Sequence, residues 1–380
     1  MNKQKITLLR LIIPLLALII FIVTIYMLNS TSADETPTAA SKFMFQRGHV
    51  IKLLNDNAST DTWTEGLRLG AQEVLVAIDN GDYEGDELIT INYLTAYGNI
   101  DLDVGSHVIV RIDFDENQNP YIASISNYNR SNIIIGLAIV FFSLLILLGG
   151  KKGIAAAMGL IFTILSIWLI LIPLLEKGFP SIPAAIIVVS TTTVVSLYLL
   201  NGYSQKTLIA TIGCIGGVSI AGLIAFIAGV VAPINGFNMP EAEEIILRTS
   251  GSGLKVSGLL VSGVLIASLG AVMDISLTIT SAVSELHDMN PQASSGKLFK
   301  SGLNIGRDAM GTMANTLILA FAGASLNMLI LFRVFDYPYM QIFNSDLMTI
   351  EIIQGLAGSI GIVLTVPLVA ALSGFIFSKK

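Results

Sequence analysis

Two series of polar residues interrupt apolar runs between Val256 and Thr316. The first series is Asp274, Thr278, Ser281 and Glu285, and the second is Asn304, Asp308, Thr312 and Asn315. Steps of three or four residues return to the same face of a helix, so each series predicts one polar stripe. Carboxylates, hydroxyls and amides on facing stripes inside a membrane can relay a proton or coordinate a cation. We expect such a path to use Asp274, Asp308, Thr278, Thr312 and Asn315.

Glu285 of the first series and Arg307 fall near the turn between the two runs and are predicted to gate the inner mouth of the path. Simpler interpretations remain open for most of these positions. Glu285 can be solvated at the membrane surface, Arg307 can be a membrane anchor, and Asp308 can pair with Arg307 or with the start of its helix. Thr312 and Asn315 can hold helices together by hydrogen bonds. Asp274 is the hardest to explain structurally, because no Lys or Arg lies between Lys255 and Lys297.

The composition indicates the environment in which these stripes lie. The chain has 380 residues, of which 53% are hydrophobic and 13% charged. Apolar runs of membrane-spanning length predict a polytopic α-helical membrane protein. Seven spans are expected after residue 131, at about 132–150, 153–175, 180–200, 207–232, 256–283, 309–333 and 350–376. An earlier run, Thr7 to Leu28, is longer than the apolar core of a cleaved signal peptide, which predicts an uncleaved anchor and about eight transmembrane helices in all.

Basic residues recur in alternate loops between the predicted spans. Those assigned to the cytoplasmic side are Lys151, Lys152, Lys206, Lys297, Lys300, Arg307, Lys379 and Lys380. This bias predicts that both termini are cytoplasmic and that the segment 31–130 is extracytoplasmic. The expected location is the bacterial cytoplasmic membrane.

Residues 31–130 have a different pattern from the rest of the chain. Five runs alternate between apolar and polar residues: Val50–Leu54, Glu73–Asp79, Glu87–Leu94, His107–Phe114 and Tyr121–Tyr128. Gly, Asp and Asn clusters separate the later runs, which is typical of a small antiparallel β domain, either an OB-like barrel or a sandwich. The predicted domains are therefore an anchor at 1–30, a β domain at 31–130 and a seven-helix bundle at 131–380.

Several functional classes find no support in the sequence. The single cysteine, Cys214, excludes an intrachain disulfide and a Cys-based zinc site. The acidic turns of the β domain do not match an EF-hand, and the acidic β segment does not suit a nucleic-acid partner. There is no P-loop or HExxH motif. We therefore expect neither an enzyme nor a bound metal or cofactor.

Three stretches carry a resemblance to a known family. They read LLILLGGKKGIAAAMGLIFT, GAVMDISLTITSAVSEL and GRDAMGTMANTLILAFAGASL. With the anchor and the β segment, they resemble the YibE/F family of bacterial membrane proteins over most of the chain from about Phe45. The resemblance implies a permease.

A more distant likeness covers residues 256–316. The pattern from Gly270 to Asp274, the following Glu285 and the sequence Asp308-Ala-Met-Gly-Thr312 are similar to the proton-relay helices of SecD/SecF proteins in the RND group. This likeness implies that Asp274 carries the proton, with Asp308 and Thr312 as its partners. The chain departs from that pattern in two extra spans before Asp274 and in a small, β-rich external domain.

The sequence therefore predicts a permease or export-assisting protein that is coupled to protons or ions. The alternative is a non-transporting assembly or sensory module whose β domain binds an envelope partner. Expected partners are the lipid bilayer and, through the β domain, an envelope protein or a secreted substrate, and the chain can form an oligomer.

Overall fold

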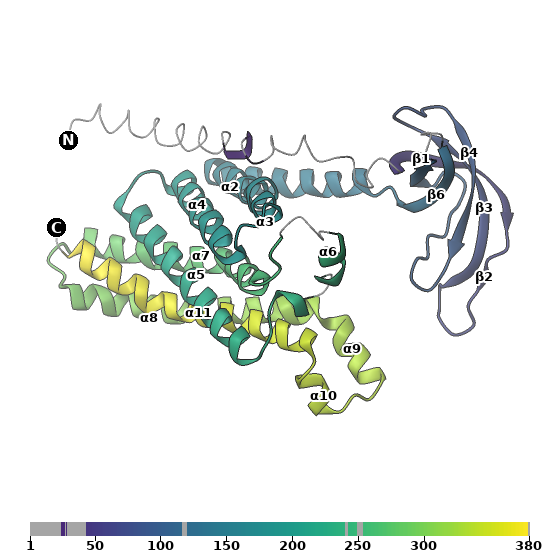
Figure 1. Ribbon diagram of the computed structural model, residues 1–380. Helices are drawn as coiled ribbons and strands as arrows, with labels where there is room; N and C mark the ends of the chain where they lie inside the picture. The colour runs from purple at the N-terminus through teal and green to yellow at the C-terminus, as the bar shows by residue number, and fades with distance from the viewer. Residues whose placement is uncertain are drawn as a thin grey trace. The chain divides into compact units, whose positions relative to one another are not determined.

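The computed structural model describes residues 24–26, 28, 43–115, 120–239, 242–248 and 254–378. It divides into two compact units, one ending at Leu144 and one that includes the chain from Leu145 onward. Figure 1 shows strands in the first part of the described chain and helices in the rest. This confirms the predicted fold class of apolar helices preceded by a β domain. The predicted anchor at 1–30 lies outside the described residues, apart from 24–26 and 28.

All five predicted β runs correspond to strands. The strands are β1 Phe43–Asp56, β2 Ser59–Thr60, β3 Arg68–Ile78, β4 Glu87–Leu94, β5 His107–Phe114 and β6 Pro120–Tyr128. The bounds of β4 and β5 are those predicted from the alternation, because polar turn residues end both strands. β1 is longer than predicted, since its pairing with β3 and β5 extends in both directions beyond the apolar run.

The strands follow the order of a partly open barrel. Antiparallel ladders join β4 to β3, β3 to β1, β1 to β5 and β5 to β6. β4 and β6, at the two ends of this series, are joined by a side chain: Thr90 Oγ1 on β4 donates to the carbonyl oxygen of Ala123 on β6 at 2.6 Å. The connectivity favours the predicted OB-like barrel over a sandwich.

After the strands, the chain forms long apolar helices and several short ones, the first of which begins in the first unit and continues into the second. They are α2 Ser131–Ser166, η2 Ile167–Leu171, α3 Ile172–Glu176, α4 Ser181–Asn201, α5 Gln205–Val231, η3 Gly236–Asn238, α6 Ala242–Arg248, α7 Leu259–Met289, α8 Ser295–Ala324, α9 Leu326–Val334, α10 Tyr339–Phe343 and α11 Asp346–Phe377. Serines begin two of them: Ser204 Oγ accepts from the Thr207 N–H, and Ser345 Oγ accepts from the Met348 N–H.

Five stretches of the described chain are long and apolar enough to cross a membrane, and the bent pair of α8 and α9 makes a sixth. The first stretch, Ser131–Glu176, contains two predicted spans. Its backbone leaves helical geometry at Gly150, with φ 55° and ψ −131°, which glycine tolerates because it lacks a Cβ. The predicted span 309–333 differs from the structure: its helix begins earlier, at Ser295, and bends by 55° between α8 and α9.

Helix α11 lies at the centre of the bundle and packs against α5, α7 and α8. Glycines permit these close contacts. A Cβ at Gly361 of α11 would lie 2.5 Å from Ala221 Cβ on α5, and one at Gly358 would lie 2.7 Å from Leu317 Cδ2 on α8. In a bilayer the association of helices depends on such close packing, because lipid is as apolar as the helix surfaces.

Candidate functional site

Helices α7 and α8 carry the two predicted polar stripes, and they run antiparallel through the turn at 290–294. A Cβ at Gly302 would lie 2.9 Å from Val283 Cγ2, and one at Gly306 would lie 2.9 Å from Ile279 Cδ1. A step of four along α8 therefore matches a step of four back along α7. Extending this register by five residues brings Gly311 to the level of Asp274.

The key carboxylates lie far from the ends of their helices. Asp274 is at the midpoint of α7, and Asp308 is close to the midpoint of α8. A helix of this length is longer than the hydrocarbon core of a bilayer, which is about 30 Å thick. If α7 spans the bilayer, Asp274 is well inside it, whereas Asp308 comes directly before the uncharged part of α8, which reaches spanning length only together with α9.

The structure turns both stripes away from the core. Asp274, Thr278 and Glu285 are exposed and Ser281 is half-buried, whereas all four members of the α8 stripe are exposed: Asn304, Asp308, Thr312 and Asn315. The buried residues of α8 are Leu298, Gly302 and Gly306, on the opposite side. The prediction that the two stripes face one another is therefore wrong for a single chain. Glycine contacts with α7 and α11 fill the place where that seam was expected.

Asp274 and Asp308, and Arg307 beside them, have no partner within the described part of the chain. Within the described residues, no hydrogen bond or ion pair joins Asp274, Arg307 or Asp308 to another group. Thr312 Oγ1 donates to the carbonyl oxygen of Ala309 at 2.8 Å, which satisfies it within its own helix. The alternative in which Asp308 pairs with Arg307 is not seen within the described residues, so this face presents unneutralised charges of both signs.

A second polar stripe on α7 points into the core and was missed by the sequence analysis. It consists of Ser276, Thr280, Ser284 and His287, all buried. Ser276 Oγ, Thr280 Oγ1 and His287 Nδ1 have no hydrogen-bond partner within the described chain. The His287 ring stacks on Phe377 of α11, with ring centroids 6.0 Å apart. The four residues of this stripe recur at steps of three or four, which is a helical spacing visible in the sequence. The prediction chose the face that carries Asp274 because that residue is charged.

The bend between α8 and α9 adjoins another group that the sequence analysis did not identify. Glu351 of α11 lines a pocket of about 220 Å³ beside Ser325, the residue at the bend. Its Oε2 is buried and has no hydrogen-bond partner in the described part of the chain. The other lining side chains are mostly apolar, so this carboxylate is poorly solvated. Glu351 lies at the edge of the predicted span 350–376, and no sequence pattern indicated a role for it.

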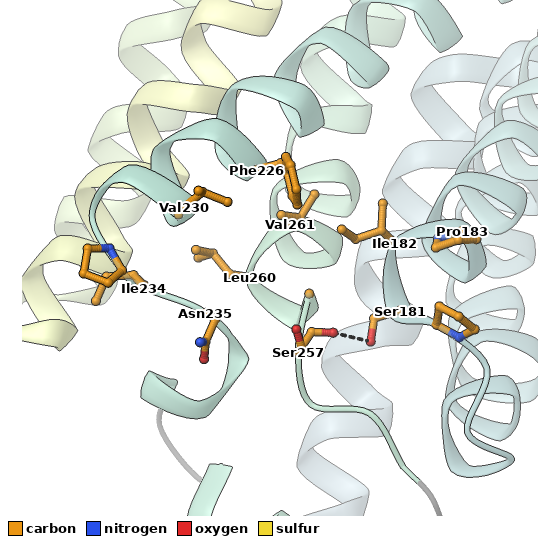
Figure 2. A pocket seen from close by; sticks show the side chains of 14 residues that line it. Ser181, Ile182, Pro183, Phe226, Val230, Ile234, Asn235, Ser257, Leu260 and Val261 are labelled. Carbon is orange, nitrogen blue, oxygen red and sulfur yellow. Dashed lines mark hydrogen bonds between the residues drawn. The ribbon is translucent and has the colours of Figure 1, made fainter.

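A larger cavity of about 440 Å³ lies among the start of α4, the end of α5 and the start of α7. Figure 2 shows Ile182, Val230 and Leu260 among its lining side chains. The hydroxyl of Ser181 donates to the carbonyl oxygens of Lys255 and Ser257, at 2.8 and 3.2 Å. None of the described residues that line the cavity is acidic or basic, so its lining suits an apolar group.

In the β domain, polar side chains form a structural network. Gln72 is fully buried, and its Nε2 donates to Asp101 Oδ1 at 3.0 Å and to the carbonyl oxygen of Leu102 at 3.1 Å. Arg68 donates to both carboxylate oxygens of Asp56 at 2.9 Å and to Asp101 Oδ1 at 2.7 Å. The hydrogen bond from Arg68 is the main cause that lowers the pKa of Asp56 below its usual value. Among the described residues, no group of three or more His, Cys, Asp or Glu side chains could hold a metal ion.

The fold and the apolar helices define a helical membrane protein with an N-terminal antiparallel β domain. A family model described as YibE/F-like protein matches residues 137–379, which is more than half of the chain, so the protein belongs to the YibE/F-like family. Searches of curated proteins and of solved structures gave no match. The predicted likeness of residues 256–316 to SecD/SecF relay helices finds no support in these comparisons.

Proposed function

We propose that the protein is a membrane permease or export-assisting protein, coupled to protons or cations through the polar faces of α7 and α8. One observation carries the proposal: Asp274 lies at the midpoint of the long apolar helix α7, exposed and with no hydrogen bond or ion pair within the described chain, and Asp308 of α8 is likewise exposed and unpaired there. Placing such a charge at the centre of a membrane helix costs about 2.5–3.5 kcal/mol on translocon-derived scales. Charged groups kept in membrane spans at this cost generally serve ion or proton pathways.

In this proposal Asp274 binds the proton or cation at mid-depth, and Asp308, Thr278, Thr312 and Asn315 extend the polar path along the helices. Glu285 lies toward the loop at 290–294 and receives the ion from the cytoplasm. Arg307 lowers the affinity of the path for cations, which favours release. The basic loops support the cytoplasmic assignment of this end and an extracytoplasmic β domain in a bacterial cell. The proposal assigns the protein no catalysis.

The test is complementation of a strain that lacks the gene. We expect deletion to cause sensitivity to an ion or drug, or a defect in secretion, and the wild-type gene to restore growth or secretion. D274N and D308N should fail to restore it although the proteins accumulate in the membrane. The control variant is D288N, which changes a carboxylate at the helix end and should restore function. Full activity of both D274N and D308N would overturn the proposal.

A second candidate function rests on the outer face of β4. The usual alternation is inverted in this strand: Thr90 and Asn92 are buried, whereas Ile89, Ile91 and Tyr93 are exposed. Exposed apolar strips of this kind mark interaction sites. This favours a module that binds an envelope protein or a secreted chain. In that case the double variant I91S/Y93S should abolish complementation while D274N retains it, the opposite of the result expected for the ion path.

A further inference from the structure

We propose that the pocket at the bend between α8 and α9 binds a small organic cation, whose charge is neutralised by Glu351 of α11. The pocket has a volume of about 220 Å³, and its lining comes from α8, α9 and α11. Glu351 Oε2 is buried and has no hydrogen-bond partner within the described chain. None of the described residues that line the pocket is basic. Since a buried carboxylate without a partner is costly, a ligand that brings a positive charge is favoured at this place.

The pocket combines one buried carboxylate with an apolar surface. Gly355 lies one turn after Glu351 on α11, and a Cβ at Gly355 would lie 3.7 Å from Phe321 Cδ2 on α8. Because the two helices run antiparallel, Ser325, one turn after Phe321, is level with Glu351. Ser325 and Gly355 are buried. The pocket is also lined by large, exposed apolar side chains: Ile318, Leu329 and Leu356.

The lining favours an organic cation over a metal ion or a proton. Ca²⁺ and Mg²⁺ take about six or more oxygen ligands, whereas only Glu351 and Ser325 bring side-chain oxygens to this lining. The Ser325 hydroxyl already donates to the carbonyl oxygen of Phe321 at 3.0 Å. A proton on Glu351 Oε2 would remove the charge, but the new O–H would have no acceptor at a site where Oε2 has no partner. An ammonium group supplies both the charge and the hydrogen-bond donors.

The apolar part of the lining determines the rest of the ligand. Phe321 offers an aromatic ring, which attracts cations, and Met348 offers a polarisable thioether. Pockets for drug-sized molecules have volumes of about 300–1,000 Å³, so a pocket of about 220 Å³ suits a smaller molecule. The ligand class is therefore a small amine with an alkyl or cycloalkyl body.

This site is separate from the proposed ion path. Ser325 follows Asp308 by 17 residues, which corresponds to about 25 Å along a helix. The inference uses neither Asp274 nor Asp308, and binding of an amine does not require transport. A protein that binds the amine without transporting leaves this inference intact, and a protein that transports without binding the amine overturns it alone.

Equilibrium dialysis of the detergent-purified, full-length protein against radiolabelled cyclohexylamine tests the site. We expect saturable binding of one molecule per chain. Unlabelled cyclohexanol, which has the same ring but no charge, should not displace the amine. Glu351→Gln keeps the size of the side chain and removes its charge, so it should weaken binding at least tenfold. The matched control is Glu176→Gln, which neutralises an exposed carboxylate at the end of α3 and should bind like the wild type.

A second variant tests the pocket while Glu351 is retained. In Gly355→Leu the Cβ makes ordinary contact with Phe321 and the longer side chain fills the pocket, so binding should again fall at least tenfold. Melting temperatures show that each variant is folded, and Gly355→Leu decides if Glu351→Gln does not accumulate. The inference is overturned if cyclohexylamine shows no saturable binding, if cyclohexanol, Na⁺ or Ca²⁺ displaces it equally well, or if either folded variant binds it as tightly as the wild type.

Discussion

Gly306 of α8 lies against Ile279 of α7, and a Cβ at Gly306 would lie 2.9 Å from Ile279 Cδ1. It would come even closer to Val366 Cγ1 of α11. One glycine thus lets three helices meet. The same contact sets the rotation of α8 about its own axis, because Gly306 faces the core and the polar stripe is therefore on the outside.

Replacing this glycine should weaken the bundle. We expect Gly306→Ala to lower the free energy of unfolding by about 1–3 kcal/mol, because the added methyl group overpacks the contact with Ile279 and Val366. The measurement is thermal unfolding of the detergent-purified protein, followed by size-exclusion chromatography. The matched control is Gly296→Ala in the first turn of α8, where a Cβ meets nothing within 4 Å. Equal effects of the two variants would show that Gly306 is not a close contact.

Neutralising Asp274 should leave the folded protein intact. The carboxylate is exposed and makes no hydrogen bond or ion pair within the described chain, so Asp274→Asn removes no stabilising contact. We expect normal accumulation in the membrane and an unchanged or higher melting temperature, since an unpaired charge is lost from an apolar helix. Quantitative immunoblotting of membranes and thermal unfolding check this. A large drop in melting temperature would reveal a structural partner for Asp274.

The network around Gln72 should be important for the β domain. Its Oε1 accepts from the Asn92 side chain at 3.1 Å and from the Leu102 N–H at 3.0 Å, in addition to the bonds that its Nε2 donates. Gln72→Leu leaves several buried polar groups without partners and should destabilise the domain by about 2–4 kcal/mol. Hydrogen exchange of β1 and β3 in the full-length protein measures the loss. Glu73→Gln, at the adjacent and less buried position, is the control and should keep wild-type protection.

Acid should loosen the same domain in a defined direction. The pKa of Asp56 in the folded protein lies below its ordinary value of 3.8, chiefly because Arg68 donates to the ionised carboxylate. The stabilisation is therefore fully present above the unfolded pKa and is lost as the pH falls through the folded one. We expect protection of β1 and β3 against hydrogen exchange, corrected for intrinsic rates, to decline as the pH is lowered below about 4. Asp56→Asn should make this decline shallower, and an unchanged pH profile would contradict the assignment.

The strands show which features of the β domain can be predicted from local sequence alone. β4 and β5 have the predicted bounds, since alternation marks each strand and polar turns mark its ends. The alternation did not predict which side of β4 is buried. Thr90 and Asn92 face inward because they reach β6, Gln72 and the carbonyl oxygen of Ile100. Those partners are distant in sequence, so only the folded β domain brings them within reach.

The sequence by itself determined the membrane class, the positions of most spans, and the membership of each polar stripe, because apolar length and helical spacing are local properties. Whether each polar stripe faces the core or the outside was decided by tertiary structure alone. In a soluble protein the apolar face of a helix points inward, but lipid is as apolar as a helix core, so hydropathy does not distinguish the two sides. In α8 the distinction came from Gly302 and Gly306, whose contacts with α7 and α11 leave Asp308 on the outside.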